Sequence, residues 1–408
     1  MRRGTLLTLL PAVLVVGLVI GPASPVWAGP IGTSLQAYYD FEVLDQSGGS
    51  NPAGFPQEAG SDTHEGRYAD MSGNGNDAYA APVGGSHFLP QSSSGRFGNA
   101  FYSLDGGSVG SMAVAAHSSG LNVDPGESFT ISVWEKVGFR TTDPSTWKPG
   151  QGRNPIWSKV DDRTVVGDNG LSLQYSVSRI RYNYNESAYC QGNYVQANHN
   201  NWDNGQWAHI VTVGTYNPGT DDVTLKTFIN GQHFAGLDVT VEDEMISNNG
   251  YFSLGSIWRT DGGTPGWPHQ RFISWNTTEG YIDDFARFDD LAFTDGEAMA
   301  TYNLAQHPDL DYDIAEVVPL LDLHRDGSGS VTVAGRTWYY SDALIGTASS
   351  AGEVVDLGGG NYELHMDLQR GTGLTTIGGQ IIAEPGTLAL AALGLAGLGG
   401  YVRRRRKA

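Results

Sequence analysis

The sequence predicts an all-β protein whose main body is one large β-sandwich. Glycine accounts for 56 of the 408 residues and charged residues for only 17 %, a composition typical of many short strands joined by turns. Between residues 35 and 311 apolar and polar residues alternate, for example at Leu171, Leu173 and Tyr175, which is the period of a half-buried strand. No long amphipathic helix is evident there, so we expect strands and turns throughout.

The charge balance excludes nucleic acid as a partner. The chain has 44 acidic residues against 24 Lys and Arg, a formal net charge of −20, whereas binding to phosphates needs a basic surface. Such a surface also repels anionic polymers unless a divalent cation bridges the two. With Cys190 as the single cysteine, one chain can form neither a disulfide framework nor a cysteine-based zinc site.

Residues 1–28 predict a signal peptide. Arg2 and Arg3 precede an apolar run over residues 6–20, and Ala28 offers a small residue at a cleavage point before Gly29. The alternative is an N-terminal anchor that is not cleaved. We exclude this segment from the prediction of the fold.

Residues 382–408 predict a sorting signal that also anchors the chain in a membrane. Glu384 and Pro385 precede an apolar stretch over 387–402 and a basic tail over 403–407. As a helix the apolar stretch would span roughly 24 Å, a little less than a ~30 Å hydrocarbon core. The basic tail would hold its end on the cytoplasmic side.

This order of motif, short apolar helix and arginine cluster resembles the PEP-CTERM sorting signal of Gram-negative, exopolysaccharide-producing bacteria, although Ala383 stands at the first proline of the motif. The resemblance implies processing by an exosortase-type enzyme near Glu384-Pro385, with the inner membrane holding the chain before that step. The alternative is an ordinary C-terminal anchor. Both place the body of the protein outside the cytoplasm, at the cell surface or in the extracellular matrix.

The strand region, residues 33–312, contains seven short blocks that resemble the LamG-like, concanavalin A-like lectin/glucanase modules of bacterial surface proteins. The resemblance implies a jelly roll of two packed antiparallel sheets. Asn230-Gly231 at the end of one block also predicts a tight hairpin. We interpret residues 313–380 as a small β appendage or linker. The blocks cover residues 38–42, 70–77, 95–100, 129–134, 207–211, 225–232 and 280–285.

The sequence lacks the acidic pair of a glycoside hydrolase on this architecture. Such enzymes need two carboxylates about 5–5.5 Å apart on one strand face, and no Glu-x-Asp-x-Glu pattern occurs. In the run 242–244, Glu242 and Glu244 lie two residues apart, but no third acid follows them in the spacing of that pattern. We interpret the run as a solvated edge of the sheet. The ten histidines show no metal-ligand spacing. We expect a protein that is not an enzyme, with a polysaccharide-degrading activity as the weaker alternative.

A glycine-punctuated turn at 70–77 is the candidate calcium site. Calcium takes six to eight oxygen ligands, and Asp70, Asn74 and Asn76 can offer them. The resemblance to LamG-like modules implies that Asp283, on a later strand, completes the site, with Glu42 as a further candidate. The alternative is that the turn forms only Asx turns and Asp283 faces solvent.

Aromatic residues near polar ones indicate where a sugar could bind. Sugar rings stack on aromatic faces, and their hydroxyls pair with Asn, Asp, Gln and Arg. We expect the ligand to contact Trp202, Trp258, Tyr182 and Tyr184, whereas the tryptophans in strand patterns should be core. The predicted function is non-catalytic binding of an extracellular polysaccharide or another matrix component. The alternative is a structural or adhesive protein that binds protein partners or itself.

Overall fold

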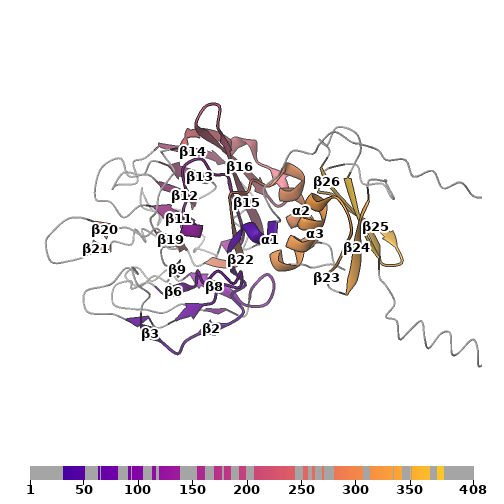
Figure 1. Cartoon of the computed structure of the whole chain (residues 1–408). Helices are drawn as coiled ribbons and strands as arrows, with labels where there is room; N and C mark the ends of the chain where they lie inside the picture. The colour runs from indigo at the N-terminus through magenta and orange to yellow at the C-terminus, as the bar shows by residue number, and fades with distance from the viewer. Residues whose placement is uncertain are drawn as a thin grey trace, which may run out of the picture.

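The computed structural model has three layers: a β-sandwich, a pair of helices and a small C-terminal sheet (Figure 1). The residues it describes are 31–50, 63–64, 66–80, 91–92, 94–103, 113–115, 119–137, 154–160, 170–176, 179–184, 193–198, 206–243, 251–255, 260–261, 269–270, 280–306, 313–333, 335–341, 350, 352–367 and 375–380.

One face of the sandwich, sheet A, is a nine-stranded antiparallel sheet. Its strand order is β17-β16-β15-β10-β22-β8-β7, with β1 paired to β22 and β18 to β16. Its strands are β1 (Leu35–Tyr39), β7 (Gln91–Ser92), β8 (Ala100–Ser103), β10 (Phe129–Val137), β15 (Trp207–Asn217), β16 (Asp222–Ile229), β17 (Gln232–His233), β18 (Val239–Glu242) and β22 (Gly280–Asp289). The predicted Asn230-Gly231 turn joins β16 to β17, and both residues have positive φ.

The facing sheet B also has nine strands, in the order β14-β13-β12-β11-β19-β9-β6-β5-β2. They are β2 (Leu44–Asp45), β5 (Arg67–Tyr68), β6 (Ala78–Ala80), β9 (Ala113–Ala115), β11 (Asn154–Val160), β12 (Gly170–Ser176), β13 (Arg179–Tyr184), β14 (Asn193–Asn198) and β19 (Tyr251–Leu254). Two short ribbons pair β3 (Gly49–Ser50) with β4 (Thr63–His64), and β20 (Thr260–Asp261) with β21 (His269–Gln270). Two 3-10 turns, η1 (Ser119–Leu121) and η3 (Ala235–Leu237), complete this part.

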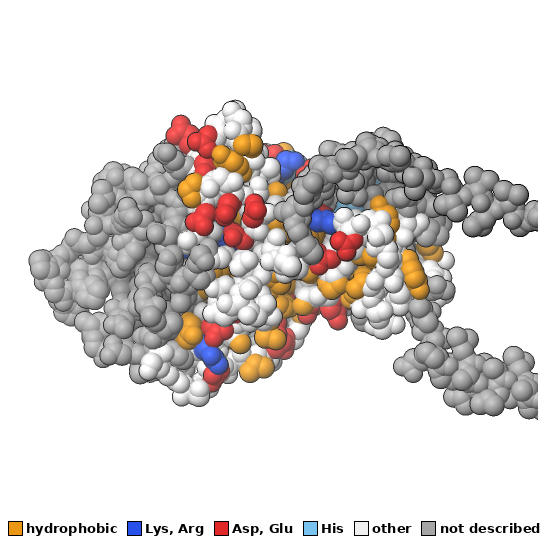
Figure 2. Space-filling model, in the orientation of Figure 1, with side chains coloured by type: hydrophobic (Ala, Val, Ile, Leu, Met, Phe, Trp, Pro, Cys, Tyr) orange, Lys and Arg blue, Asp and Glu red, His pale blue; other side chains and the backbone are white. Residues whose placement is uncertain are grey.

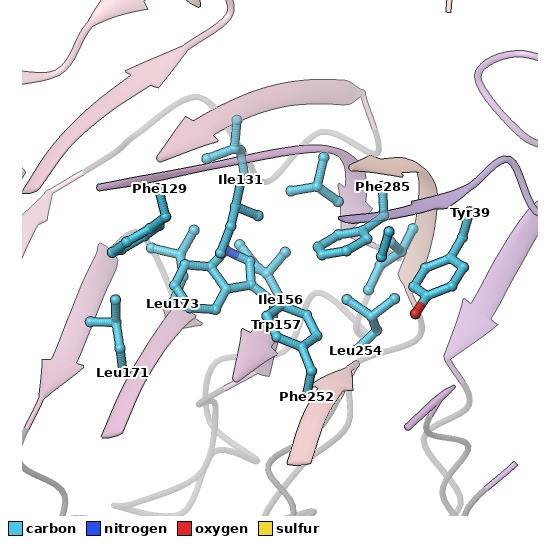
Figure 3. Packing of buried hydrophobic residues seen from close by; sticks show 14 of the residues in the cluster. Tyr39, Phe129, Ile131, Ile156, Trp157, Leu171, Leu173, Phe252, Leu254 and Phe285 are labelled. Carbon is cyan, nitrogen blue, oxygen red and sulfur yellow. The ribbon is translucent and has the colours of Figure 1, made fainter. Parts of the chain in front are cut away.

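The core between the sheets follows from the alternation that the sequence predicts. Phe129 and Ile131 of sheet A point toward Trp157, Leu171 and Leu173 of sheet B (Figure 3). Because successive strand residues point to opposite faces, every second residue enters this core. The predicted sandwich is confirmed.

Three helices lie where the sequence analysis expects strands or a linker. They are α1 (Ile31–Ser34), α2 (Asp295–Gln306) and α3 (Ile314–Asp326). Thr294 and Glu297 form a capping box before α2, each side chain accepting the other's backbone N–H. The Asp313 side chain caps α3 by accepting from the backbone N–H of Glu316. The expectation of strands and turns throughout residues 35–311 is therefore wrong at α2, and these caps are the local signal that indicates the helices.

The C-terminal sheet packs on the sandwich through the helices. Its strand order is β23 (Ser330–Val333), β24 (Arg336–Ser341), β27 (Thr375–Gln380), β26 (Asn361–Asp367), β25 (Val354–Gly358). Val211 and Phe288 on the outer face of sheet A share a second core with Leu320, Trp338 and Leu364. Helix α3 and the five described strands between residues 330 and 380 thus form a layer that packs on the sandwich.

No helix among the described residues is long and apolar enough to cross a membrane. The predicted anchor helix at 387–402, like the predicted signal peptide, lies outside the described residues.

The N-terminal turn is part of the second core. Ile31 is fully buried against α3, and the backbone N–H of Gly32 donates to the Asp322 carboxylate at 3.2 Å. We expect Ile31→Ala to lower the free energy of unfolding by about 2–4 kcal/mol, because it leaves a cavity in a packed core. Urea denaturation measures this, and Val43→Ala is the matched control because Val43 is 75 % exposed. Equal midpoints for both variants would contradict the docking of residue 31.

Candidate functional site

The two outer faces of the sandwich differ in what covers them. Helices α2 and α3 and the C-terminal sheet pack on the outer face of sheet A. On the outer face of sheet B, no described helix packs. The outer face of sheet B is therefore the candidate binding face.

Three neighbouring strands place a row of serines on this face. Ser158 of β11 pairs with Ser172 of β12 on one side and Ser253 of β19 on the other. Its hydroxyl lies 2.6 Å from that of Ser253. The residues on either side of Ser158, Trp157 and Lys159, pair with core residues, so alternation directs the serines outward. All three serines are nevertheless buried.

An arginine and a tyrosine extend this face toward the edge strand β14. The Arg181 guanidinium lies 5.5 Å from the centre of the Tyr194 ring, within the range of a cation–π contact. Tyr194 is 53 % exposed, and Gln196 beside it is also exposed. A planar cation, an open aromatic ring and an amide are the groups that recognise sugar faces and hydroxyls.

Two of the predicted ligand-binding residues point the other way. Tyr182 is 0 % exposed, and its hydroxyl lies 2.7 Å from both Thr212 and Thr227 of sheet A. Tyr184 packs against the same core. Tyr182 therefore ties the two sheets together and cannot be a surface contact, which corrects that prediction. The residue next to it, Arg181, lies on the outer face. The sequence thus predicted the correct strand for the site but assigned the wrong face of that strand to the ligand.

The predicted ligand-binding Trp202 and Trp258 lie outside the described residues. The tryptophans expected in the core behave as predicted at two positions. Trp134 and Trp157 are buried, whereas Trp207 is half-buried at the start of β15. Trp157 stacks on Phe252 in the sandwich.

The Asp70 carboxylate is fully engaged by the protein's own backbone. Its Oδ1 accepts from the N–H groups of Tyr38 and Ser72, at 3.0 and 2.9 Å, and its Oδ2 accepts from the N–H of Asn76 at 3.0 Å. Asp70 is buried. It therefore closes its own turn and attaches that turn to β1, as an Asx-type turn does.

The two asparagines of the turn donate rather than accept. The Asn74 and Asn76 side-chain amides donate to the backbone carbonyls of Leu35 and Gln36, respectively. An asparagine serves calcium through its amide oxygen, whereas these amides direct their NH₂ groups to carbonyls of β1. The two asparagines thus attach the turn to β1.

Asp283 holds a different loop. Its Oδ2 accepts from the backbone N–H groups of Arg96 and Phe97, at 2.6 and 3.0 Å, while Glu42 accepts from the N–H of Asn99. Burial raises the pKa of Asp283 to about 7, although the backbone donors act in the opposite direction. The block at 95–100 is therefore a backbone cradle for two carboxylates.

The predicted calcium ligands do not fit an ion as they are arranged. The Asp70 and Asp283 oxygens already accept N–H donors of two separate loops. Among the described residues, no three His, Cys, Asp or Glu side chains gather around a point that could hold a metal. Calcium binding by these residues stays a prediction.

One buried Ser–His pair resembles part of a catalytic triad. The His209 Nε2 lies 2.8 Å from the Ser132 hydroxyl, but its Nδ1 has no hydrogen-bond partner. Burial lowers the pKa of His209 to about 3, and Trp134 and Tyr302 lie against its ring. Among the described residues no carboxylate orients the imidazole, and the serine is fully buried. The pair is a hydrogen bond between β10 and β15 on the face of sheet A that Tyr302 of α2 covers.

Comparison with known proteins identifies the C-terminus. Residues 384–407 match the family described as the PEP-CTERM protein-sorting motif. The chain carries a sorting signal. This motif indicates an exported protein that is sorted to the cell envelope of a Gram-negative bacterium, with processing by an exosortase. No curated protein matches the chain.

Solved structures resemble the chain weakly. The binding domain of Paraclostridial Mosquitocidal Protein 1 is 13 % identical over 67 % of this chain, with a TM-score of 0.41, and the match spans 52 % of that structure, about half its length. The botulinum neurotoxin serotype C1 binding domain is 12 % identical, covering 85 % of this chain and 69 % of that one, with a TM-score of 0.41. The Ruminococcus gnavus IT-sialidase CBM40 bound to α2,3 sialyllactose is 12 % identical, covering 44 % and 83 %, with a TM-score of 0.29. At these scores the likeness carries no argument about function.

Proposed function

We propose that this protein is exported, processed by an exosortase near Glu384-Pro385 and retained at the cell surface or in the extracellular matrix. There the outer face of sheet B binds a carbohydrate or another matrix component without catalysis. The LamG-like, concanavalin A-like character of the sandwich belongs to this proposal. The observation that carries it is the exposed pair Tyr194 and Gln196 on edge strand β14, beside Arg181, on the face of sheet B that no described helix covers.

The charge of the molecule favours neutral glycans over polyanions. Acidic side chains prevail over basic ones on the face shown in Figure 2, in keeping with the net charge of −20. Because like charges repel across an interface, an acidic polysaccharide would bind only with a bridging cation. Neutral and acidic polysaccharides, each with and without calcium, are therefore the probes.

The proposal that the protein is not an enzyme rests on what the described carboxylates do. Asp243, at the centre of the acidic run 242–244, is buried and accepts from the backbone N–H of Gly126 at 2.8 Å. We expected this run to be a solvated edge, and Asp243 corrects that expectation. Asp243 has a structural role, and the sequence contains no Glu-x-Asp-x-Glu pattern.

A binding screen with the full-length protein tests the proposed function. We expect Tyr194→Ala to weaken binding to the glycan that the wild type selects by about tenfold, because an open aromatic ring supplies stacking that alanine cannot. Tyr339→Ala is the matched control, since Tyr339 is also exposed but lies on the C-terminal sheet. Glycan-array binding and titration calorimetry are the measurements.

Three outcomes would overturn the proposal in different ways. Absence of binding by a folded protein would remove the lectin function, and concentration-dependent self-association would then favour the adhesive alternative. Equal losses for Tyr194→Ala and Tyr339→Ala would place the site elsewhere. New reducing ends or unsaturated products from a polysaccharide would show an enzyme.

A further inference from the structure

The C-terminal sheet contains two buried titratable side chains that satisfy none of their hydrogen-bonding atoms. Glu363 and His365 of β26 are both 0 % exposed. Both carboxylate oxygens of Glu363 and both ring nitrogens of His365 lack a hydrogen-bond partner. Burying such groups unpaired costs several kcal/mol in general, so four orphaned atoms at neighbouring positions call for a ligand.

The two side chains share one face of the strand. Tyr362, Leu364 and Met366 of β26 pack into the second core against the helices. Alternation then directs the residues between them, Glu363 and His365, to the opposite face of the sheet. Their Cα atoms are roughly 7 Å apart in an extended strand, a spacing from which two side chains can converge on one ion.

A glycine leaves space beside Glu363. In the neighbouring strand β27, Gly378 pairs with Glu363 on one side and with Tyr339 of β24 on the other. No side chain therefore stands between the positions of Glu363 and Tyr339 on that face. On the other flank Glu363 pairs with Val355 of β25, which offers no polar group.

We propose that Glu363 and His365 bind a divalent transition metal of the zinc class. Imidazole nitrogen and carboxylate oxygen together suit such metals at bond lengths of about 2.0–2.2 Å, whereas calcium prefers oxygen alone. Two protein ligands leave the remaining coordination positions of the ion to water. This site is separate from the face of sheet B and does not depend on the proposed glycan function.

The test uses full-length protein stripped of metal with a chelator. Zn²⁺ binding is followed by titration calorimetry, and Co²⁺ by its visible ligand-field absorption. We expect one ion per chain in the wild type, a higher melting temperature with Zn²⁺ but not with Mg²⁺, and at least about tenfold weaker binding for Glu363→Gln and for His365→Asn. His233→Asn is the matched control, because His233 pairs with Asp238 in the sandwich.

The proposal fails if the folded wild type takes up no Zn²⁺, or if Glu363→Gln and His365→Asn bind it as tightly as His233→Asn does. Because Glu363→Gln and His365→Asn are nearly isosteric, both should fold. Circular dichroism confirms this before each titration. If one does not fold, the Zn²⁺-dependent shift in the melting temperature of the wild type still decides the question. A shift equal to that with Mg²⁺ would overturn the site.

Discussion

Asp70→Ala should be among the most destabilising substitutions in this protein. The variant removes the acceptor of three backbone N–H groups, the buried ones of Tyr38 and Asn76 and the half-buried one of Ser72. Each N–H would stay unpaired in a site with little water, so we expect the free energy of unfolding to fall by about 3–5 kcal/mol. Asp70→Asn should lose less, since its amide oxygen can still accept at one position. Urea denaturation of both variants measures the effect.

The control for this substitution is Asp45, an acid in the same part of the sandwich whose partners are exposed: Arg67 and the backbone N–H of Ser47. Asp45 pairs with Arg67 at 3.1 Å, with both side chains over one-third exposed, and such pairs contribute little to stability. Asp45→Ala should therefore leave the midpoint nearly unchanged. If Asp45→Ala and Asp70→Ala were equally stable, the role of Asp70 in closing the turn would be wrong.

The same variants decide between the turn and the calcium prediction. If Asp70 serves only the backbone, adding Ca²⁺ or a chelator should shift the midpoint of neither the wild type nor Asp70→Ala. If Asp70 binds calcium, Ca²⁺ should stabilise the wild type, and Asp70→Ala should abolish that gain by linkage. The second result would restore the calcium site that the sequence predicts.

Glu135→Gln should stabilise the protein increasingly as the pH rises. Glu135 faces the sandwich core from β10, where it pairs with Ala208 and Ile282, and its Oε2 has no hydrogen-bond partner. Burial raises the pKa of this carboxyl from 4.5 to about 8. The folded state thus keeps a proton that the unfolded chain releases near pH 4.5, and stability is lost as the pH rises between these two values.

The expected size follows from that window. Each pH unit between about 4.5 and 8 should cost the wild type roughly 1.4 kcal/mol relative to Glu135→Gln, up to about 3 kcal/mol near neutral pH. Denaturation of both proteins from pH 4.5 to 8.5 measures the difference. The acidic end is the internal control, because a protonated glutamic acid and a glutamine are nearly isosteric and neutral. A difference that does not change with pH would show that Glu135 finds a charged partner.

The sequence predicted the sandwich well but the candidate site only in part. Alternation identified the strands that carry Leu171 and Ile131, and the Asn-Gly turn identified a hairpin, because both signals are local. The alternation of apolar and polar residues did not indicate α2, because this helix is short. Its local signal is the capping box formed by Thr294 and Glu297. The metal-ligand spacing of Glu363 and His365 was missed for a related reason. A spacing of two is meaningful only when the residues are known to lie in a strand.

By itself the sequence determined the strand-rich body and the C-terminal sorting motif, because periodicity, turn residues and short motifs are local properties. Only the tertiary structure decided which face of each strand is buried. The alternation places Arg181 on one face of its strand and Tyr182 on the other. It does not say which of the two faces packs against the opposite sheet. The tertiary structure also decided which groups the Asp70 and Asp283 carboxylates bind. Besides the nearby N–H groups of Ser72 and Asn76, Asp70 accepts from Tyr38, and Asp283 accepts from Arg96; these two partners are far away in the chain, and no local pattern reveals them.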